Sequence, residues 1–203
     1  MSTPAASPAV VALGDPSARW LADAAQWSEG RLWQWRVPLL AALAWIGVRH
    51  LAEPEYWSIF MGLTLALHEI GHILFAPFGE TMSVAGGSIT QLLAPVAAGL
   101  VLRRQRDWFG VAVAGCWLAF SLANLGTYIG DARAGELPLV SVGESEEVIH
   151  DWSYLLDLAG WLHLDASFAR LARALSACTL GASVLFGGWL CRRMMTSTPK
   201  SAA

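Results

Sequence analysis

Five long apolar runs, separated by short polar or charged segments, dominate the pattern of hydrophobic and polar positions along the chain. A membrane-spanning helix needs about 20 mostly apolar residues, and each run is compared with that length. The runs cover residues 33–48, 57–78, 84–102, 108–130 and 171–190. The first is short, and as a span it would be tilted or shallow. The pattern predicts an all-α, polytopic membrane helix bundle with about five transmembrane helices.

The segments outside these runs predict smaller features. Residues 1–30 are rich in Ala, Ser and Pro and predict an N-terminal tail without the basic start of a secretory signal. Within it, residues 16–27 are weakly amphipathic, which fits either a helix on the membrane surface or part of a disordered tail. Residues 152–164 are semi-apolar but too short to span, which predicts an interfacial or re-entrant helix between the fourth and fifth spans. An acidic stretch precedes them: Glu136, Glu144, Glu146 and Glu147. Without an internal repeat, residues 31–203 are assigned to one membrane-embedded domain.

Composition supports the membrane prediction independently. The chain is 55% hydrophobic and only 14% charged, against about 25% charged residues in soluble domains. Its eleven tryptophans fit interfacial belts. The chain is therefore expected to be an integral, multi-pass membrane protein in contact with the lipid bilayer, with a bacterial inner membrane as the expected location. A net charge of −3 predicts no nucleic-acid partner. With five spans the basic residues divide seven against six between the two sides, which leaves the orientation open.

The second run contains an H-E-x-x-H pattern, His68-Glu69-Ile70-Gly71-His72. On a helix, two histidines four residues apart share one face, so both imidazoles reach one metal ion while Glu69 projects beside them. Ionisable groups in a membrane segment are costly unless they face a cavity, a metal or a partner. The pattern predicts a Zn²⁺ site with His68 and His72 as ligands.

Asp131 is the first choice for the third zinc ligand. The second and fourth spans run in the same direction if there are five, so His72 and Asp131 lie toward the same face of the membrane. Asn124 lies seven residues before Asp131 and shares its helix face. His150 and Asp151 form a possible replacement ligand or a pair that supports the ligands, although a His-Asp pair in a loop is also typical of a solvated turn or cap.

These residues resemble the site-2 proteases, a family of intramembrane zinc metalloproteases. The resemblance covers about residues 57–133 and rests on the H-E-x-x-H helix, on Gly86-Gly87-Ser88 with Gln91, and on Asn124 followed by Asp131. Ala132 stands where the family has a glycine after the aspartate. The resemblance implies an enzyme that hydrolyses peptide bonds of membrane-protein substrates, with Asp131 as third ligand.

The mechanism implied is hydrolysis by a zinc-activated water, with Glu69 accepting the proton of that water and passing it to the leaving amine. Asn124 would donate a hydrogen bond to the substrate carbonyl or the developing oxyanion. Gly86 and Gly87 would let an extended substrate segment approach the backbone, and they fit helix packing equally well.

Two other classes of function share part of this pattern. A catalytically silent zinc-bound membrane scaffold would keep the same ligands, although Glu69 is not needed to bind zinc and so favours an enzyme. A divalent-metal transporter is suggested by likeness to the H-E-x-P-H-E helix of zinc and iron permeases, but the chain has too few spans for that family. The sequence does not identify the oligomeric state.

Overall fold

The computed structural model describes residues 16–137 and 150–197. This part of the chain is built from helices and contains no strand. The elements are α1 (Pro16–Ser28), α2 (Arg36–Ala52), α3 (Ile59–Phe75), a 3-10 turn η1 (Ala76–Phe78), α4 (Glu80–Arg104), α5 (Trp108–Gly130), α6 (Asp151–Leu158), a second 3-10 turn η2 (Leu162–Leu164) and α7 (Asp165–Thr196). The all-α prediction is confirmed.

Local sequence explains where the central helices begin. Asp107 precedes α5 and its carboxylate accepts a hydrogen bond from the Gly110 N–H at 3.0 Å, which caps the helix. The Ser58 hydroxyl caps α3 by accepting from the Phe60 N–H. Gly79, with φ of 98°, forms the turn between η1 and α4, a conformation that favours glycine. These signals fix the ends of the helices that carry the candidate site.

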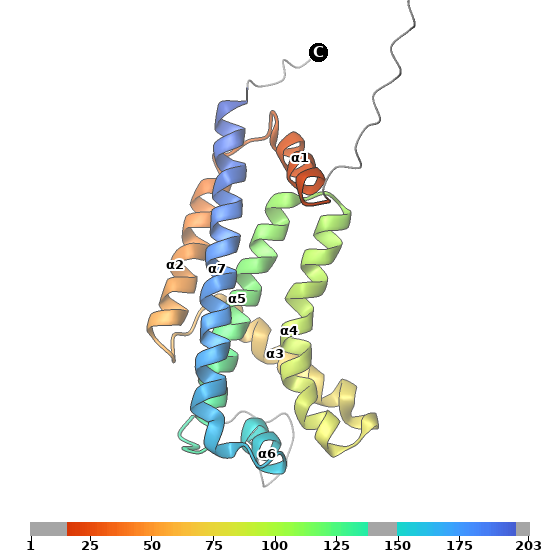
Figure 1. Cartoon of the computed structure of the whole chain (residues 1–203), viewed down its shortest axis with the longest axis vertical. Helices are drawn as coiled ribbons and strands as arrows, with labels where there is room; N and C mark the ends of the chain where they lie inside the picture. Colours follow the sequence, from red (N-terminus) through yellow and green to blue (C-terminus); the bar gives the residue numbers. More distant parts are fainter. Residues whose placement is uncertain (1–15, 138–149, 198–203) are drawn as a thin grey trace, which may run out of the picture.

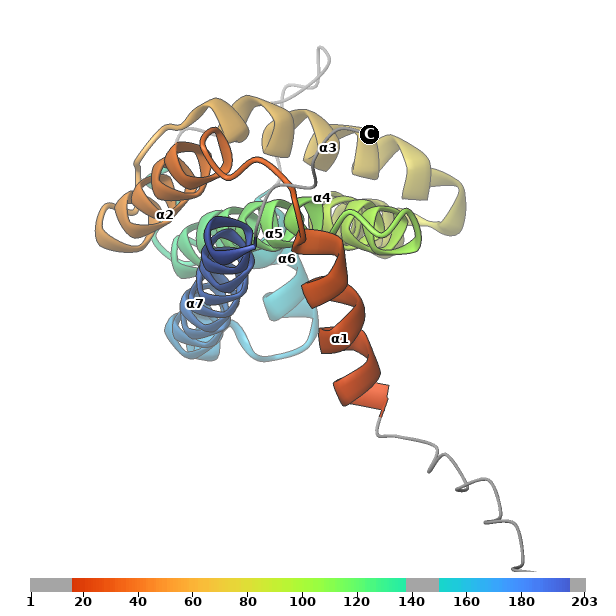
Figure 2. The same ribbon diagram turned by 90° about the horizontal axis from the view of Figure 1, so that it is seen from above.

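Helix α5 is the central element, and α7, α4 and α2 pack around it (Figures 1 and 2). The core beside the middle of α5 joins residues from α2, α5 and α7: Leu43, Cys116, Ala119, Phe120 and Leu180. A helix that is apolar on all sides belongs in such a buried position. The three cysteines are free: Cys116 and Cys191 are buried among apolar residues, and Cys178 is exposed.

Four helices in the described part of the chain are long and apolar enough to cross a membrane, covering residues 59–78, 80–104, 108–130 and 162–196. They indicate a membrane protein. The first predicted run, which was expected to be short, forms α2, whose 17 residues fall just below that length. The predicted run 84–102 lies within the longer α4, and the run 171–190 lies within α7.

Helix α3 is placed differently from the other long helices. In Figure 1, α4, α5 and α7 run along the long axis of the molecule, whereas α3 runs across behind them, and Figure 2 shows α3 along its length. The H-E-x-x-H sequence therefore lies in the half of the bundle that also contains α6.

The segment predicted to be interfacial, residues 152–164, forms most of α6 together with η2, and neither is long enough to span. Helix α6 lies at the end of the bundle opposite α1 (Figure 1). The predicted amphipathic stretch 16–27 forms most of α1, which packs on α7 through Trp20 and Ala24. The acidic residues Glu144, Glu146 and Glu147 lie outside the described residues.

Candidate metal centre

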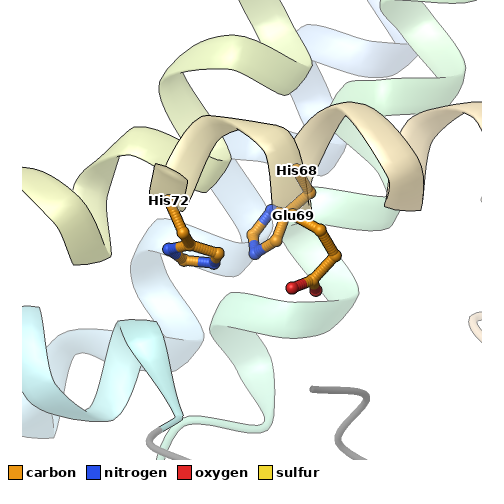
Figure 3. Close-up of side chains that lie close together, drawn as sticks. All are labelled: His68, Glu69 and His72. Carbon is orange, nitrogen blue, oxygen red and sulfur yellow. The ribbon is translucent and has the colours of Figure 1, made fainter. Parts of the chain in front are cut away.

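His68 and His72 project from the same side of α3, as Figure 3 shows. Both imidazoles also lie close to the carboxylate of Asp151, which the figure does not draw. Asp151 Oδ2, at the start of α6, lies 2.9 Å from His68 Nε2 and 3.4 Å from His72 Nε2. His68 and Asp151 are buried, whereas the His72 side chain is 25% exposed. The cluster therefore joins residues 83 positions apart and has one side open to the surface.

The outer nitrogen of each imidazole is held by a hydrogen-bond acceptor. His68 Nδ1 lies 3.1 Å from Gln91 Oε1, and His72 Nδ1 lies 2.9 Å from the Ser83 carbonyl oxygen. Because a carbonyl oxygen only accepts, both Nδ1 atoms carry the proton in the neutral tautomer. Each Nε2 then presents its lone pair toward Asp151.

The orientation of the Gln91 amide is fixed by its own partners. Its Nε2 donates to the Ser121 carbonyl at 2.9 Å and to Asn124 Oδ1 at 3.1 Å. Both partners are acceptors, so the NH₂ group belongs on that side and Oε1 belongs on the side of His68. The tautomer assigned to His68 therefore follows from a chain of hydrogen bonds that reaches into α5.

The arrangement brings two acceptor atoms, His68 Nε2 and His72 Nε2, to one carboxylate oxygen, Asp151 Oδ2. Such a cluster needs a cation between its members, either protons on the imidazoles or a metal ion. Ligand bonds of 2.0–2.2 Å in a tetrahedral zinc site put neighbouring ligand atoms roughly 3.3–3.6 Å apart. The observed 3.4 Å from His72 Nε2 to Asp151 Oδ2 lies within that range, whereas the 2.9 Å from His68 Nε2 is shorter and is a hydrogen-bond distance. A carbonyl acceptor behind each imidazole is also the usual support of metal-binding histidines.

Asp151 is held in place from several sides. Its backbone N–H donates to the Tyr128 hydroxyl at 3.2 Å. His150 caps α6, because its Nδ1 accepts from the Ser153 N–H at 3.2 Å. Trp152 Nε1 donates to the Ser88 hydroxyl on α4 at 3.1 Å. Burial opposes ionisation of Asp151, but hydrogen bonds from the His68 and His72 imidazoles, when these carry a proton on Nε2, outweigh it and hold the pKa of this carboxyl below its usual range.

Asp131, the predicted third ligand, has a different position. Its carboxylate oxygens accept hydrogen bonds from the Glu136 and Leu137 N–H groups at 2.9 and 3.1 Å. Oδ2 also lies 3.5 Å from His150 Nε2. Asp151 therefore contacts the two histidines, whereas Asp131 forms hydrogen bonds within the turn after α5. The reason is that two backbone donors beyond the helix end satisfy the Asp131 carboxylate locally.

Glycines allow α3 and α4 to approach at the site. A Cβ added to Gly87 would lie 2.7 Å from His68 Nε2 and 2.8 Å from His72 Nε2. Gly71 and Gly86 face each other, and a Cβ on Gly86 would lie 2.5 Å from the Gly71 carbonyl oxygen. Both Gly86 and Gly87 lie inside the continuous helix α4, so they do not offer a strand edge to a substrate. Two roles were predicted for these glycines, substrate approach and helix packing, and the structure supports helix packing.

Glu69 and Asn124 were the predicted catalytic residues. Together with His68 and His72, Glu69 offers a ligand atom, and these three atoms lie within 4.8 Å of one another. No hydrogen bond or ion pair joins its carboxylate to another residue in the described ranges. Asn124 contacts Gln91, the residue that holds His68, because its Oδ1 accepts a hydrogen bond from Gln91 Nε2. Its role toward a substrate stays a prediction.

Comparisons with protein-family models, with curated proteins and with solved structures found no match. The resemblance to site-2 proteases therefore stays a prediction. The support for the candidate metal centre is its geometry.

Two contributors to this geometry have no strong signal in the sequence. The Ser83 carbonyl is a backbone group, so the identity of residue 83 says little about it. Tyr128 is one of three tyrosines in the chain, and its ring stacks on His150 with centroids 4.3 Å apart. Only its position one turn before Asp131 on the same helix could have suggested a place near the site.

Proposed function

We propose that this chain is an integral, multi-pass membrane zinc metalloprotease that hydrolyses peptide bonds of membrane-protein substrates. The observation that carries the proposal is the convergence of His68 Nε2, His72 Nε2 and Asp151 Oδ2, with both Nδ1 atoms already committed to acceptors. Two imidazoles and one carboxylate form a donor set used by catalytic zinc sites, which keep a fourth position for water or substrate. When bound, zinc would supply Lewis acidity and a water of lowered pKa.

The protein's own residues have separate tasks in this proposal. Gln91 and the Ser83 carbonyl orient the two imidazoles, so that the lone pairs face the centre before any metal arrives. Glu69, beside them and without a partner in the described residues, is placed to accept a proton at its carboxylate and return it to a leaving amine.

The surroundings support a substrate that arrives from the membrane. Helix α3 exposes a row of large apolar side chains on the side away from the bundle: Leu63, Ile70, Ile73 and Leu74. Such a surface is favourable in lipid and would be costly in water. A peptide bond in a helix is not accessible to hydrolysis while the helix is wound. The proposed substrates are therefore membrane segments with residues that weaken a helix.

The test uses purified protein reconstituted in vesicles with a panel of single-span proteins that differ in helix-weakening residues near one membrane face. Wild type is expected to contain zinc and to cleave some members of the panel. Glu69→Gln is expected to contain as much zinc as wild type and to cleave none, because only the proton acceptor is changed. Cleavage is followed by gel electrophoresis and metal by atomic emission.

Two results would contradict the proposal in different ways. Well-folded wild type without zinc would remove the metal centre itself. Zinc binding together with equal behaviour of wild type and Glu69→Gln toward every substrate would leave a zinc-bound scaffold that does not cleave.

A further inference from the structure

The charged residues of the described chain are divided between the two ends of the bundle. One end, called the basic end here, consists of residues 16–36, 103–108 and 190–197. It holds eight arginines against three carboxylates, a net charge of +5. The arginines are Arg19, Arg31, Arg36, Arg103, Arg104, Arg106, Arg192 and Arg193. All but Arg36 are exposed.

The remainder of the described chain has the opposite balance. It contains four arginines and nine carboxylates, a net charge of −5. Two of the four arginines are neutralised by close carboxylates: Arg49 lies 2.6 Å from Glu53, and Arg133 lies 2.7 Å from Asp165. The unpaired positive charge of the molecule is therefore concentrated at the basic end.

Packing holds the three parts of the basic end together. One core cluster joins Ala24 of α1, Leu40 near the start of α2, Trp108 at the start of α5 and Leu190 near the end of α7. The Gly30 N–H also donates to the Ser197 hydroxyl, across 167 residues of sequence. Figure 1 shows α1, the turn between α4 and α5, and the end of α7 at one end of the bundle, with α6 at the other.

The distance between the two ends matches a membrane. Between Arg173 and Arg192, α7 has 18 residues without a charge, 174–191, which is about 27 Å of helix. Helix α4 has 22 such residues, 81–102, or about 33 Å. The hydrocarbon core of a bilayer is about 30 Å thick. A bilayer that surrounds these helices would therefore have the basic end at one face and Glu80 and Arg173, where the uncharged stretches stop, toward the other.

The candidate metal centre lies nearer the acidic face. Gln91, which contacts His68, is twelve residues from Arg103 on α4, about 18 Å along the helix. This is more than half the thickness of the hydrocarbon core when measured from the basic end. Because α3 crosses the bundle instead of running along it, Arg19, Arg31 and Arg36, at and before the start of α2, stand on the same side as the arginines after α4. Among the described residues, eight arginines therefore lie at the basic end and four in the remainder. Five spans predicted a near-even division of the basic residues instead.

We propose that the basic end is the cytoplasmic end of the protein, held against anionic lipid headgroups, and that the metal centre opens toward the opposite side of the membrane. Arginines near a membrane surface are retained on the cytoplasmic side, while carboxylates have little influence on orientation. The cytoplasmic leaflet also attracts basic segments through its anionic lipids. This proposal goes beyond the proposed function and does not depend on it, since orientation is set by charge and not by chemistry at the zinc site.

The experiment measures which end of the full chain is reachable from outside intact bacterial cells. Single cysteines are introduced at exposed positions as Gln105→Cys, in the turn between α4 and α5, and as Ala134→Cys, after α5 at the other end. A maleimide that does not cross membranes labels them before and after lysis. The parent chain, whose three cysteines lie in the helices α5 and α7, gives the background.

The proposal expects Ala134→Cys to be labelled in intact cells and Gln105→Cys only after lysis. The reverse pattern would overturn the orientation. Labelling of both positions in intact cells, or of neither, would overturn the placement of the two ends on opposite faces. None of these results depends on zinc or on cleavage, so they are separate from the test of the proposed function.

Two pairs of substitutions then test whether the arginines are the cause. Arg103→Gln with Arg104→Gln, placed in the Gln105→Cys chain, is expected to increase the fraction labelled in intact cells, because part of the cytoplasmic signal is lost. Arg133→Gln with Arg170→Gln is the matched pair at the other end and is expected to leave that fraction unchanged. Equal increases from both pairs would show that the basic end does not set the orientation.

Discussion

Two His–Asp pairs lie close together in this molecule and differ in what their atoms can do. In the metal centre, two Nε2 atoms meet one oxygen of Asp151, and each Nδ1 already has an acceptor. In the other pair, His150 Nδ1 accepts from the backbone, so its proton is on Nε2, which lies 3.5 Å from Asp131 Oδ2. The Asp131 carboxylate also accepts two backbone N–H groups.

The difference shows that closeness of histidine and aspartate does not define a metal site. The decisive feature is which imidazole nitrogen is committed elsewhere. Where Nδ1 donates to a carbonyl, Nε2 is left with a lone pair for a metal. Where Nδ1 accepts from a helix N-terminus, Nε2 keeps its proton and cannot ligate. His150 therefore serves as the cap of α6, the helix that begins with Asp151.

The largest expected effect separates the two aspartates. Asp151→Ala removes the carboxylate that meets both histidines and should reduce bound zinc from about one per chain to near zero. Asp131→Asn keeps an acceptor oxygen in the turn after α5 and should bind zinc as wild type does. Metal content of purified, folded protein measures both. Loss of zinc in Asp131→Asn with retention in Asp151→Ala would reverse the assignment of the third ligand.

A second, smaller effect is expected from the support of His68. Gln91→Ala removes the acceptor that holds the proton on Nδ1, and substitutions of this kind typically lower metal affinity about 10–100-fold. Gln91→Glu keeps an oxygen toward His68 but turns its second oxygen toward the Ser121 carbonyl and Asn124 Oδ1, both acceptors, so it should retain only part of the affinity. Competition with a chelator gives the affinities. Equal zinc affinities of Gln91→Ala and Gln91→Glu would show that the Gln91 oxygen does not fix the tautomer of His68.

The close approach of α4 to the histidines gives a third effect. Gly87→Ala places a methyl group 2.7 Å from His68 Nε2 and should cost about 1–3 kcal/mol of stability through overpacking. Gly99 on the same helix is the matched control, since an added Cβ would meet Ala114 at an ordinary 3.6 Å. Thermal unfolding in detergent compares them. Equal unfolding temperatures for the two variants would mean that the histidines can move aside.

The smallest effect is expected at Tyr128. Tyr128→Phe keeps the ring that stacks on His150 and removes the hydroxyl that accepts from the Asp151 N–H. The loss of one hydrogen bond should cost about 1 kcal/mol, measured by unfolding, with zinc content unchanged. A complete loss of zinc in Tyr128→Phe would indicate instead that the hydroxyl belongs to the metal site and not to its support.

Much of the fold follows from the sequence because hydrophobic runs decide helix positions. The run 108–130 coincides with α5, and the predicted interfacial segment proved too short to span. The number of spans was harder to predict, since α2 has the composition of a span but only 17 residues. Nor does a run of apolar residues reveal that α3 crosses the bundle, because that direction is set by contacts with α4.

At the candidate site, the histidine spacing was sufficient to place His68 and His72 together, because it depends only on helix geometry. The choice between Asp131 and Asp151 was not accessible in the same way. Asp131 follows the apolar run 108–130, whereas Asp151 follows the acidic stretch. The outcome depends on the backbone donors of Glu136 and Leu137, which come from a turn without a recognisable pattern. His150, which the sequence left open between ligand, support and helix cap, has the last of these roles.

The separation of 83 residues between His68 and Asp151 has a consequence for how the protein is made. During synthesis both histidines leave the ribosome long before Asp151 does, and α4 and α5 are inserted in between. A nascent chain that stops before residue 151 has the two imidazoles but lacks the carboxylate. The complete site closes a long loop of chain, so metal capture would also draw the late helices onto the early ones. Maturation of the centre would then report that assembly of the bundle is finished.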